Sequence, residues 1–251
     1  MIIIMIIIKL YLLCSPKLLK RKRIILYNSK GIRATSPTTL YSNKGEKLMS
    51  AILTDLKKTV IAGLVLTVIM IYAIASATGD VFVIDEVYIN FIVRWLHVLA
   101  GVMWIGLLYY FNFVQIPNMP NIPDEQKPAI GKVIAPAALF WFRWGAMATI
   151  ISGLILSHLN GYLVESLTLG VTEDFANTKH IAIGIGMWMG IIMFINVWFV
   201  IWPNQKRALG IVEASAEQKA ASARTAMLFS RTNTLLSFPM LYAMVSAQNI
   251  Y

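Results

Sequence analysis

The sequence predicts an all-α fold, a polytopic membrane bundle of about five transmembrane helices. Hydrophobic residues make up 58% of the 251 residues, and the mean hydropathy is +0.68. A soluble fold of this composition would have too little polar surface to face water. Five segments after residue 58 are also apolar over the roughly 20 residues that a hydrocarbon core of about 30 Å requires.

The chain is predicted to divide at residue 48. Residues 1–48 carry most of the formal net charge of +10, with many Lys and Arg residues and one acid, Glu46. The transmembrane domain, residues 49–251, is nearly neutral, so we expect no nucleic-acid partner. Three origins stay open for the extension: a basic targeting segment, an N-terminal anchor, or upstream sequence preceding a natural start at Met49, which we favour.

The predicted spans are separated by polar loops, and the last span contains Pro239, which we interpret as a kink because neighbouring helices can satisfy the freed carbonyl. In chain order the spans cover residues 59–77, 90–114, 137–158, 180–202 and 227–247.

The charges of the loops predict the orientation. Lys and Arg residues gather before the first span, between the second and third spans, and between the fourth and fifth, whereas the other two loops are mainly acidic. Because basic loops stay in the cytoplasm, we expect a multi-pass protein of the cell inner membrane with its C-terminus outside.

Two histidines share a local pattern in predicted spans: His97 precedes Gly101 and His180 precedes Gly184 by four residues. Four residues are about one helical turn, so each imidazole has bare backbone beside it, as a flat macrocycle requires. An imidazole in a membrane is costly and is typically functional. The pattern predicts haem b held by His97 and His180 between the second and fourth helices.

One face of the second span supports this interpretation. Gly101 gives room beside His97, Trp104 would line the pocket, and Arg94 would pair with a haem propionate or anchor the helix at the interface. Because His158 is also expected near the outer boundary, a metal bound by His97, His158 and His180 remains an alternative. The histidines could also be purely structural, reaching the interface with their polar edges.

Longer sequence segments also indicate a family. The Arg94–Gly106 segment, Trp141–Trp144 with Ser152-Gly153, Gly186–Gly190 leading into Asn196–Gln205, and Asn233–Pro239 resemble the urate oxidase N-terminal domain family. This domain is the membrane portion of the bacterial membrane-bound urate hydroxylase, and the resemblance runs from about residue 90 to 248. It implies oxidation of urate, with electrons passed to an outward-facing cytochrome c domain.

This chain departs from that family in one respect that bears on electron transfer. Its single cysteine, Cys14, lies in the basic extension, so the Cys-x-x-Cys-His motif of a cytochrome c domain is absent. A separate cytochrome c would have to accept the electrons, or the fold serves another small-molecule substrate.

The second span is also similar to the haem-dependent membrane protoporphyrinogen oxidase family. His97, Trp104 and the Gly106-Leu107-Leu108-Tyr109 string carry this shorter resemblance. It implies a haem independently of urate.

We therefore expect a membrane redox protein that binds haem b, oxidises a small urate-like substrate and passes electrons to an extracytoplasmic cytochrome. The alternative is a non-catalytic membrane subunit or assembly factor, and a second alternative is a protoporphyrinogen-oxidase-like enzyme. A transporter is disfavoured because no carboxylate lies within a predicted span to couple ions.

Overall fold

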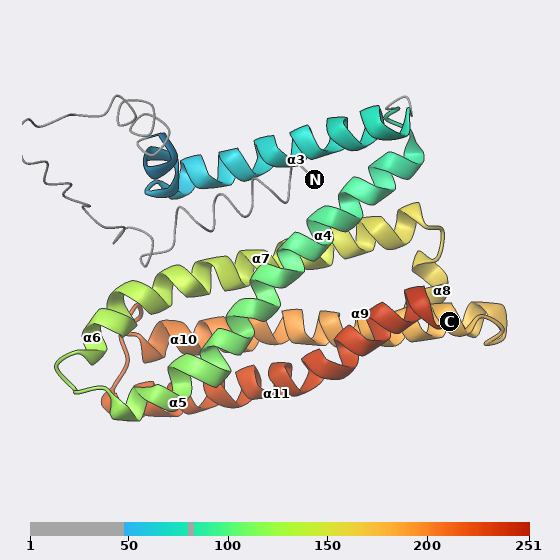
Figure 1. The fold of residues 1–251 in the computed structure, drawn as a ribbon. Coiled ribbons are helices and arrows are strands. Elements are labelled where there is room, and N and C mark those ends of the chain that lie inside the picture. Colours follow the sequence, from blue (N-terminus) through green and yellow to red (C-terminus); the bar gives the residue numbers. More distant parts are fainter. Residues whose placement is uncertain (1–47, 80–82) are drawn as a thin grey trace, which may run out of the picture. The chain divides into compact units, whose positions relative to one another are not determined.

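The computed structural model describes residues 48–79 and 83–251, shown in Figure 1. All regular secondary structure in these residues is helical, which confirms the predicted all-α class. The chain divides into two compact units, residues 1–83 and 84–251. The predicted basic extension lies outside the described residues except for its last residue, so its division from residues 49–251 stays a prediction.

The first unit contains one long apolar helix, α3 (Leu56–Thr78). Asp55 caps its start by accepting hydrogen bonds from the backbone N–H groups of Lys57 and Lys58, and Gly79 ends it in the left-handed conformation. None of its 23 residues is buried. A long apolar helix with no buried face has the surface expected of a span that contacts lipid.

The second unit begins with two long helical segments. The first comprises α4 (Glu86–Tyr109), the π-helix η1 (Tyr110–Gln115), α5 (Ile116–Asn118) and the 3₁₀ turn η2 (Met119–Asn121), and the second comprises α6 (Lys127–Ala129), the π-helix η3 (Ile130–Ile134) and α7 (Ala135–Leu159).

Two further segments complete this unit. After the short α8 (Leu163–Leu167) and the 3₁₀ turn η4 (Val171–Glu173), the chain forms α9 (Thr178–Ile195), the π-helix η5 (Asn196–Ile201) and α10 (Trp202–Ala208), and it ends with α11 (Ala216–Asn249). Asp85 and Asn177 cap α4 and α9 with their side chains, and Ser215 and Gln218 form a capping box at the start of α11.

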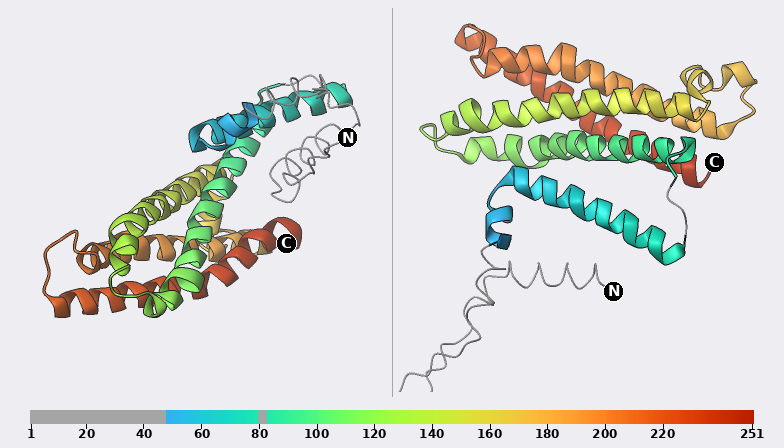
Figure 2. Two further views of the ribbon diagram at one scale, coloured as in Figure 1. Left: turned by 60° about the vertical axis from the view of Figure 1, so that its left-hand side comes forward. Right: turned by 90° about the horizontal axis from the view of Figure 1, so that it is seen from above.

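Within residues 84–251 the long helices run up and down beside one another (Figures 1 and 2). Helix α4 packs along α7, and α9 packs along α11. The first and last helices, α4 and α11, contact each other over a much shorter stretch. They meet where the Tyr109 hydroxyl lies 2.9 Å from Ser237 Oγ, and they diverge toward the end of the bundle that holds α8 (Figure 1).

The chain is a multi-pass membrane protein. Four helical segments are long and apolar enough to cross a membrane, Leu56–Thr78, Glu86–Asn121, Lys127–Leu159 and Thr178–Ala208. They correspond to the first four predicted spans. The fifth predicted span, 227–247, is helical and continues through Pro239. Its helix, α11, is not among the four helices that are apolar enough to cross a membrane.

Polar residues of α11 explain that difference: Arg231 and Thr232 are exposed, and others, including Ser230 and Asn233, face the bundle. Asn196 donates from Nδ2 to Asn233 Oδ1 over 2.8 Å, and Asn233 donates to the Met193 carbonyl over 2.9 Å. Asn112 likewise donates to Ser230 Oγ over 2.8 Å. These bonds join α11 to η1, α9 and η5, so part of its low hydropathy reflects helix-to-helix hydrogen bonding.

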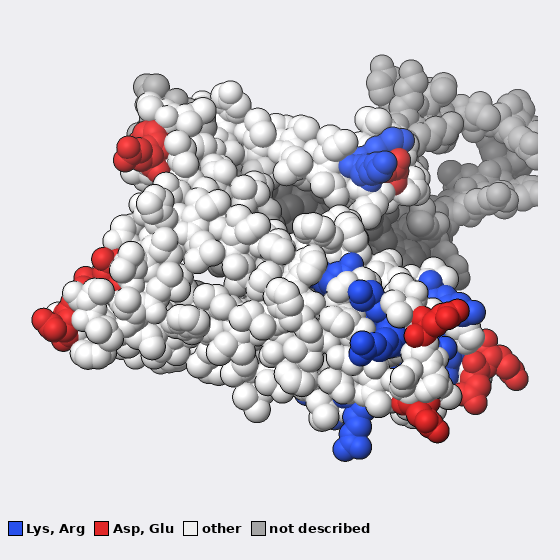
Figure 3. All heavy atoms as spheres, turned by 180° about the vertical axis from the view of Figure 1, so that it is seen from behind, with Lys and Arg blue, Asp and Glu red and all other residues white. Residues whose placement is uncertain are grey.

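On the face in Figure 3, Lys and Arg of residues 84–251 gather toward one end, where acids such as Asp124, Glu213 and Glu217 also lie, whereas the other end shows acids. We call the end that holds α8 the acidic end; its acids are Asp85, Glu86, Glu165, Glu173 and Asp174. We call the other end the basic end; its bases are Lys127, Lys132, Lys206, Arg207, Lys219 and Arg224. That the basic end faces the cytoplasm remains a prediction.

Candidate ligand cavity

A cavity of about 680 Å³ lies among α4, α7, α9 and α11, in the half of the bundle where α4 and α11 diverge. Its volume falls within the roughly 300–1,000 Å³ typical of small-molecule sites. Most of its lining is apolar, including three methionines, Met187, Met240 and Met244. Its polar lining residues besides Tyr109 lie toward the acidic end: Arg94, His97, Thr149, Tyr162, Gln248 and Asn249.

His97 is held against α7 by one edge of its ring. Its Nδ1 lies 3.0 Å from the Thr149 carbonyl oxygen and 3.1 Å from Ser152 Oγ. The carbonyl can only accept, and the Ser152 hydroxyl already donates to the Ala148 carbonyl over 2.6 Å, so Nδ1 carries the proton. The neutral ring then has its lone pair on Nε2, which has no hydrogen-bond partner among the residues that the structure describes.

Gly153 allows this close packing. A Cβ atom at residue 153 would lie 3.0 Å from His97 Cε1 and 3.3 Å from Nδ1. Gly153 was predicted only as part of a family string, and the roles of Thr149 and Ser152 were not predicted at all. No periodicity in the sequence marks a glycine that makes room for a side chain of another helix.

The predicted residues of the second span line this cavity. Arg94, Gly101 and Trp104 all belong to its wall, together with Gly106. A Cβ at Gly101 or Gly106 would meet no heavy atom within 4 Å. Trp104 is 1% exposed, and its indole N–H is buried without a hydrogen-bond partner. This wall therefore offers bare backbone near His97, and Trp104 forms a buried part of it.

Arg94 reaches the same wall about one turn closer to the acidic end. Its Nη2 donates to Asn90 Oδ1 over 3.4 Å, and none of the ion pairs among the described residues involves it. Its remaining donors are free to pair with an anionic group at the mouth of the cavity.

His180 lies in a different environment from His97. Its Nδ1 is 2.7 Å from Glu173 Oε2, and its Nε2 is 3.4 Å from Asn177 Nδ2. The Tyr162 ring packs against it at 5.5 Å between centroids. Tyr162 lines the cavity and His180 does not, so both nitrogens of His180 have protein partners outside the cavity lining.

The glycine one turn after His180 has a packing role in the structure. A Cβ at Gly184 would collide with the carbonyl oxygen of Ser166 in α8. Gly184 does not line the cavity. The absence of a side chain here lets the α8 backbone contact α9, so the room predicted for a macrocycle is filled by protein.

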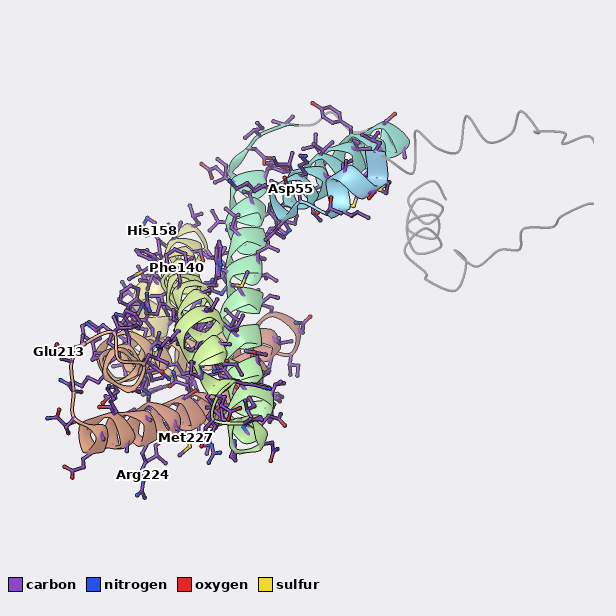
Figure 4. The ribbon with its side chains drawn as sticks, turned by 90° about the vertical axis from the view of Figure 1, so that its left-hand side faces the viewer. Asp55, Phe140, His158, Glu213, Arg224 and Met227 are labelled. Carbon is purple, nitrogen blue, oxygen red and sulfur yellow. The ribbon has the colours of Figure 1, made fainter. Side chains whose placement is uncertain are left out.

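His158 is exposed on α7, at the periphery of the bundle in Figure 4. No group of three or more His, Cys, Asp or Glu side chains that could hold a metal lies together in residues 48–79 and 83–251. The structure therefore does not gather His97, His158 and His180 at one point. Haem ligation by His97 and His180 stays a prediction.

Tyr162, between α7 and α8, forms part of the cavity wall toward the acidic end. Burial raises the pKa of its hydroxyl above the usual tyrosine value, although the positive charge of Arg94 and a hydrogen bond with Gln248 act in the opposite direction. The hydroxyl is therefore a neutral hydrogen-bonding group at the cavity mouth at ordinary pH.

Residues 162–250 match the family model described as urate oxidase N-terminal. The match confirms the predicted resemblance for the part of the chain that forms α8, α9 and α11, including Tyr162 of the cavity wall. His97 and the other cavity residues of α4 and α7 precede it. No curated protein and no solved structure gives a significant match to the chain.

Proposed function

We propose that residues 84–251 bind haem b in the cavity beside His97 and that the protein is a membrane oxidoreductase. The observation that carries the proposal is the orientation of His97, whose Nδ1 is anchored to Thr149 while Nε2 keeps a lone pair without a protein partner. Haem-binding histidines are oriented in this way by a hydrogen bond from the other ring nitrogen.

The other cavity residues fit such a group. Gly101 and Gly106 leave open space along α4, the lining is mainly apolar, and Arg94 at the mouth would pair with a propionate. His97 would be the axial ligand, and a bound haem would supply one-electron transfer. Because His180 is bonded to Glu173 and Asn177, we propose ligation by His97 without His180.

The proposed reaction is oxidation of a small urate-like substrate, with the electrons passed to a separate cytochrome c. The family match supports urate as the first substrate to test. The cavity lies toward the acidic end, which the charge distribution predicts to face outward from the cell inner membrane. An outward position suits an extracytoplasmic electron acceptor.

The first experiment is spectroscopic. The purified full chain, supplied with haem, is expected to show a Soret band, and His97→Ala is expected to lose it. His158→Ala is the matched control because this histidine is exposed, and it should retain the band. A wild-type protein without the band, or a His97→Ala variant that keeps it in full, contradicts the proposal. Urate-dependent reduction of added cytochrome c then tests the substrate.

A second candidate reaction is oxidation of a protoporphyrinogen-like tetrapyrrole. It is supported by the position of Trp104, Gly106 and Tyr109, because these residues of the second resemblance all line the same cavity as His97. Appearance of protoporphyrin fluorescence when the substrate is added to the haem-loaded protein, without any response to urate, would favour it. A chain that binds no haem would instead favour the non-catalytic membrane subunit.

A further inference from the structure

A second cluster of unusual side chains lies toward the basic end, away from the cavity. Arg143 of α7 places its guanidinium carbon 3.3 Å from the ring centroid of Trp202, the first residue of α10. The same carbon is 6.0 Å from the Trp198 ring. Lys206 Nζ lies 5.7 Å from the Trp202 ring. Two cations therefore share one indole, within the roughly 6 Å over which cation–π attraction acts.

The hydrogen-bonding capacity of this cluster is not used by the protein. Arg143 Nε and Nη1 and the indole N–H of Trp198 are buried without hydrogen-bond partners. None of the ion pairs among the described residues includes Arg143 or Lys206. An aromatic face stabilises the positive charge but leaves the guanidinium donors unpaired, and unpaired buried donors are costly.

The cluster lies at the depth expected for lipid headgroups. At about 1.5 Å per residue, Arg143 is roughly 24 Å from the Leu159 end of α7. Its side chain leans toward the helix N-terminus and hence toward the basic end. The span therefore reaches the edge of a hydrocarbon core of about 30 Å near the guanidinium. Tryptophan and arginine are typical of this interface.

We propose that Arg143, Trp202 and Lys206 form a binding site for the phosphate of an anionic phospholipid headgroup. The guanidinium would donate through Nη2, its one terminal nitrogen that is not buried, to a phosphate oxygen in a charge-assisted hydrogen bond, and Lys206 would supply the second positive charge. Arg143 is only partly buried, so a lipid can approach it from the membrane. Two cations without a paired carboxylate favour a headgroup with net negative charge over a zwitterionic one.

Native mass spectrometry of the purified full chain, titrated with phosphatidylglycerol, tests the site. Arg143→Gln is expected to weaken binding of this lipid about tenfold, the effect of losing charge-assisted hydrogen bonds. Arg207→Gln is the matched control, because it removes the same charge from an exposed side chain on α10, the helix that carries Trp202 and Lys206. It should weaken binding less than about twofold.

Two further arms identify the source of the phosphate. Phosphatidylcholine should bind more weakly than phosphatidylglycerol to the wild type and should respond less to Arg143→Gln. Inorganic phosphate alone should not protect the wild type against thermal unfolding. Equal losses of phosphatidylglycerol affinity in Arg143→Gln and Arg207→Gln would overturn the proposal, because net charge alone would then explain the binding. Protection by inorganic phosphate, with no difference between the two lipids, would overturn the assignment to a lipid.

Lys206→Gln provides a second test of the lipid site if Arg143→Gln does not fold. Lys206 shares the Trp202 ring whereas Arg207 is exposed, so Lys206→Gln should weaken phosphatidylglycerol binding several-fold more than Arg207→Gln. Identical binding by these two variants would contradict the site.

Discussion

The two His-x-x-x-Gly segments have the same sequence spacing but opposite surroundings. His97 lines a cavity and its Nε2 has no hydrogen-bond partner among the described residues, and Gly101 has open space beside it. His180 is bonded to Glu173 and Asn177, and Gly184 lies against the carbonyl of Ser166. A glycine one turn from a histidine makes room in both cases. What occupies that room depends on the neighbouring element: α8 lies beside Gly184, whereas no atom of another described element lies within 4 Å of a Cβ at Gly101.

Substitution of Gly184 and of Gly101 gives the largest expected difference in stability. Gly184→Ala would force a Cβ into the Ser166 carbonyl, a backbone atom that cannot move without shifting α8, so we expect a loss of about 2–3 kcal/mol in the free energy of unfolding. Gly101→Ala meets only open space and should stay within about 0.5 kcal/mol of the wild type. Thermal unfolding of the two variants in one detergent measures the difference. Equal stabilities would mean that the two segments do not differ as described.

Gly153→Ala tests how tightly the His97 ring is positioned. The new Cβ would lie 3.0 Å from Cε1 of a ring whose Nδ1 is fixed to Thr149, so the imidazole must turn. We expect haem affinity to fall about fivefold to tenfold, or roughly 1 kcal/mol, with the protein still folded. Haem titration monitored at the Soret band provides the measurement, with Gly63→Ala in α3 as a control that meets nothing within 4 Å. Unchanged affinity would show that the ring orientation is not needed.

His180→Ala tests whether the second histidine is structural. The substitution removes the 2.7 Å contact with Glu173 and the packing against Tyr162, and because the pair is partly exposed we expect a loss of only about 1 kcal/mol in stability. Haem content and the reduced-minus-oxidised spectrum should stay as in the wild type. A loss of the band comparable with that of His97→Ala would restore the two-histidine site.

The smallest expected effect is on the stability of the protein at alkaline pH. Because burial raises the pKa of Tyr162, its hydroxyl contributes stability that is fully present below the usual tyrosine pKa of about 10 and is lost as the pH rises through the raised value in the folded protein. Tyr162→Phe should therefore remove part of the decline in stability at high pH. Unfolding curves across this range, compared with absorbance of the phenolate, will measure it. An unchanged decline in the variant would assign the loss to other groups.

Much of the fold could be predicted because apolar length and loop charge act locally along the chain. The first four spans follow from those two signals. The fifth was also predicted as a span. Its Asn233 and Ser230 form hydrogen bonds with Asn196 and Asn112, which lie far away in sequence. Hydropathy alone cannot separate a polar residue that bonds another helix from one that faces water.

The candidate site was partly predictable for the same reason. Arg94, His97, Gly101 and Trp104 were placed on one face of one helix by helical spacing, and all four line the same cavity. The partners Thr149 and Gly153 belong to another helix, and the Glu173 partner of His180 belongs to the loop after α8. Such pairings depend on how helices dock, which spacing within one helix does not encode.

The route of the chain through the cavity wall has a consequence for biosynthesis. The wall is built from α4, α7, α9 and α11, and α11 is the last of these four to be synthesised. A nascent protein that has inserted only as far as α10 lacks Met240, Met244 and Gln248, and with them one complete side of the enclosure. A ligand that needs all four wall helices can therefore be loaded only after α11 has been made and has docked, so loading follows insertion of the other three wall helices.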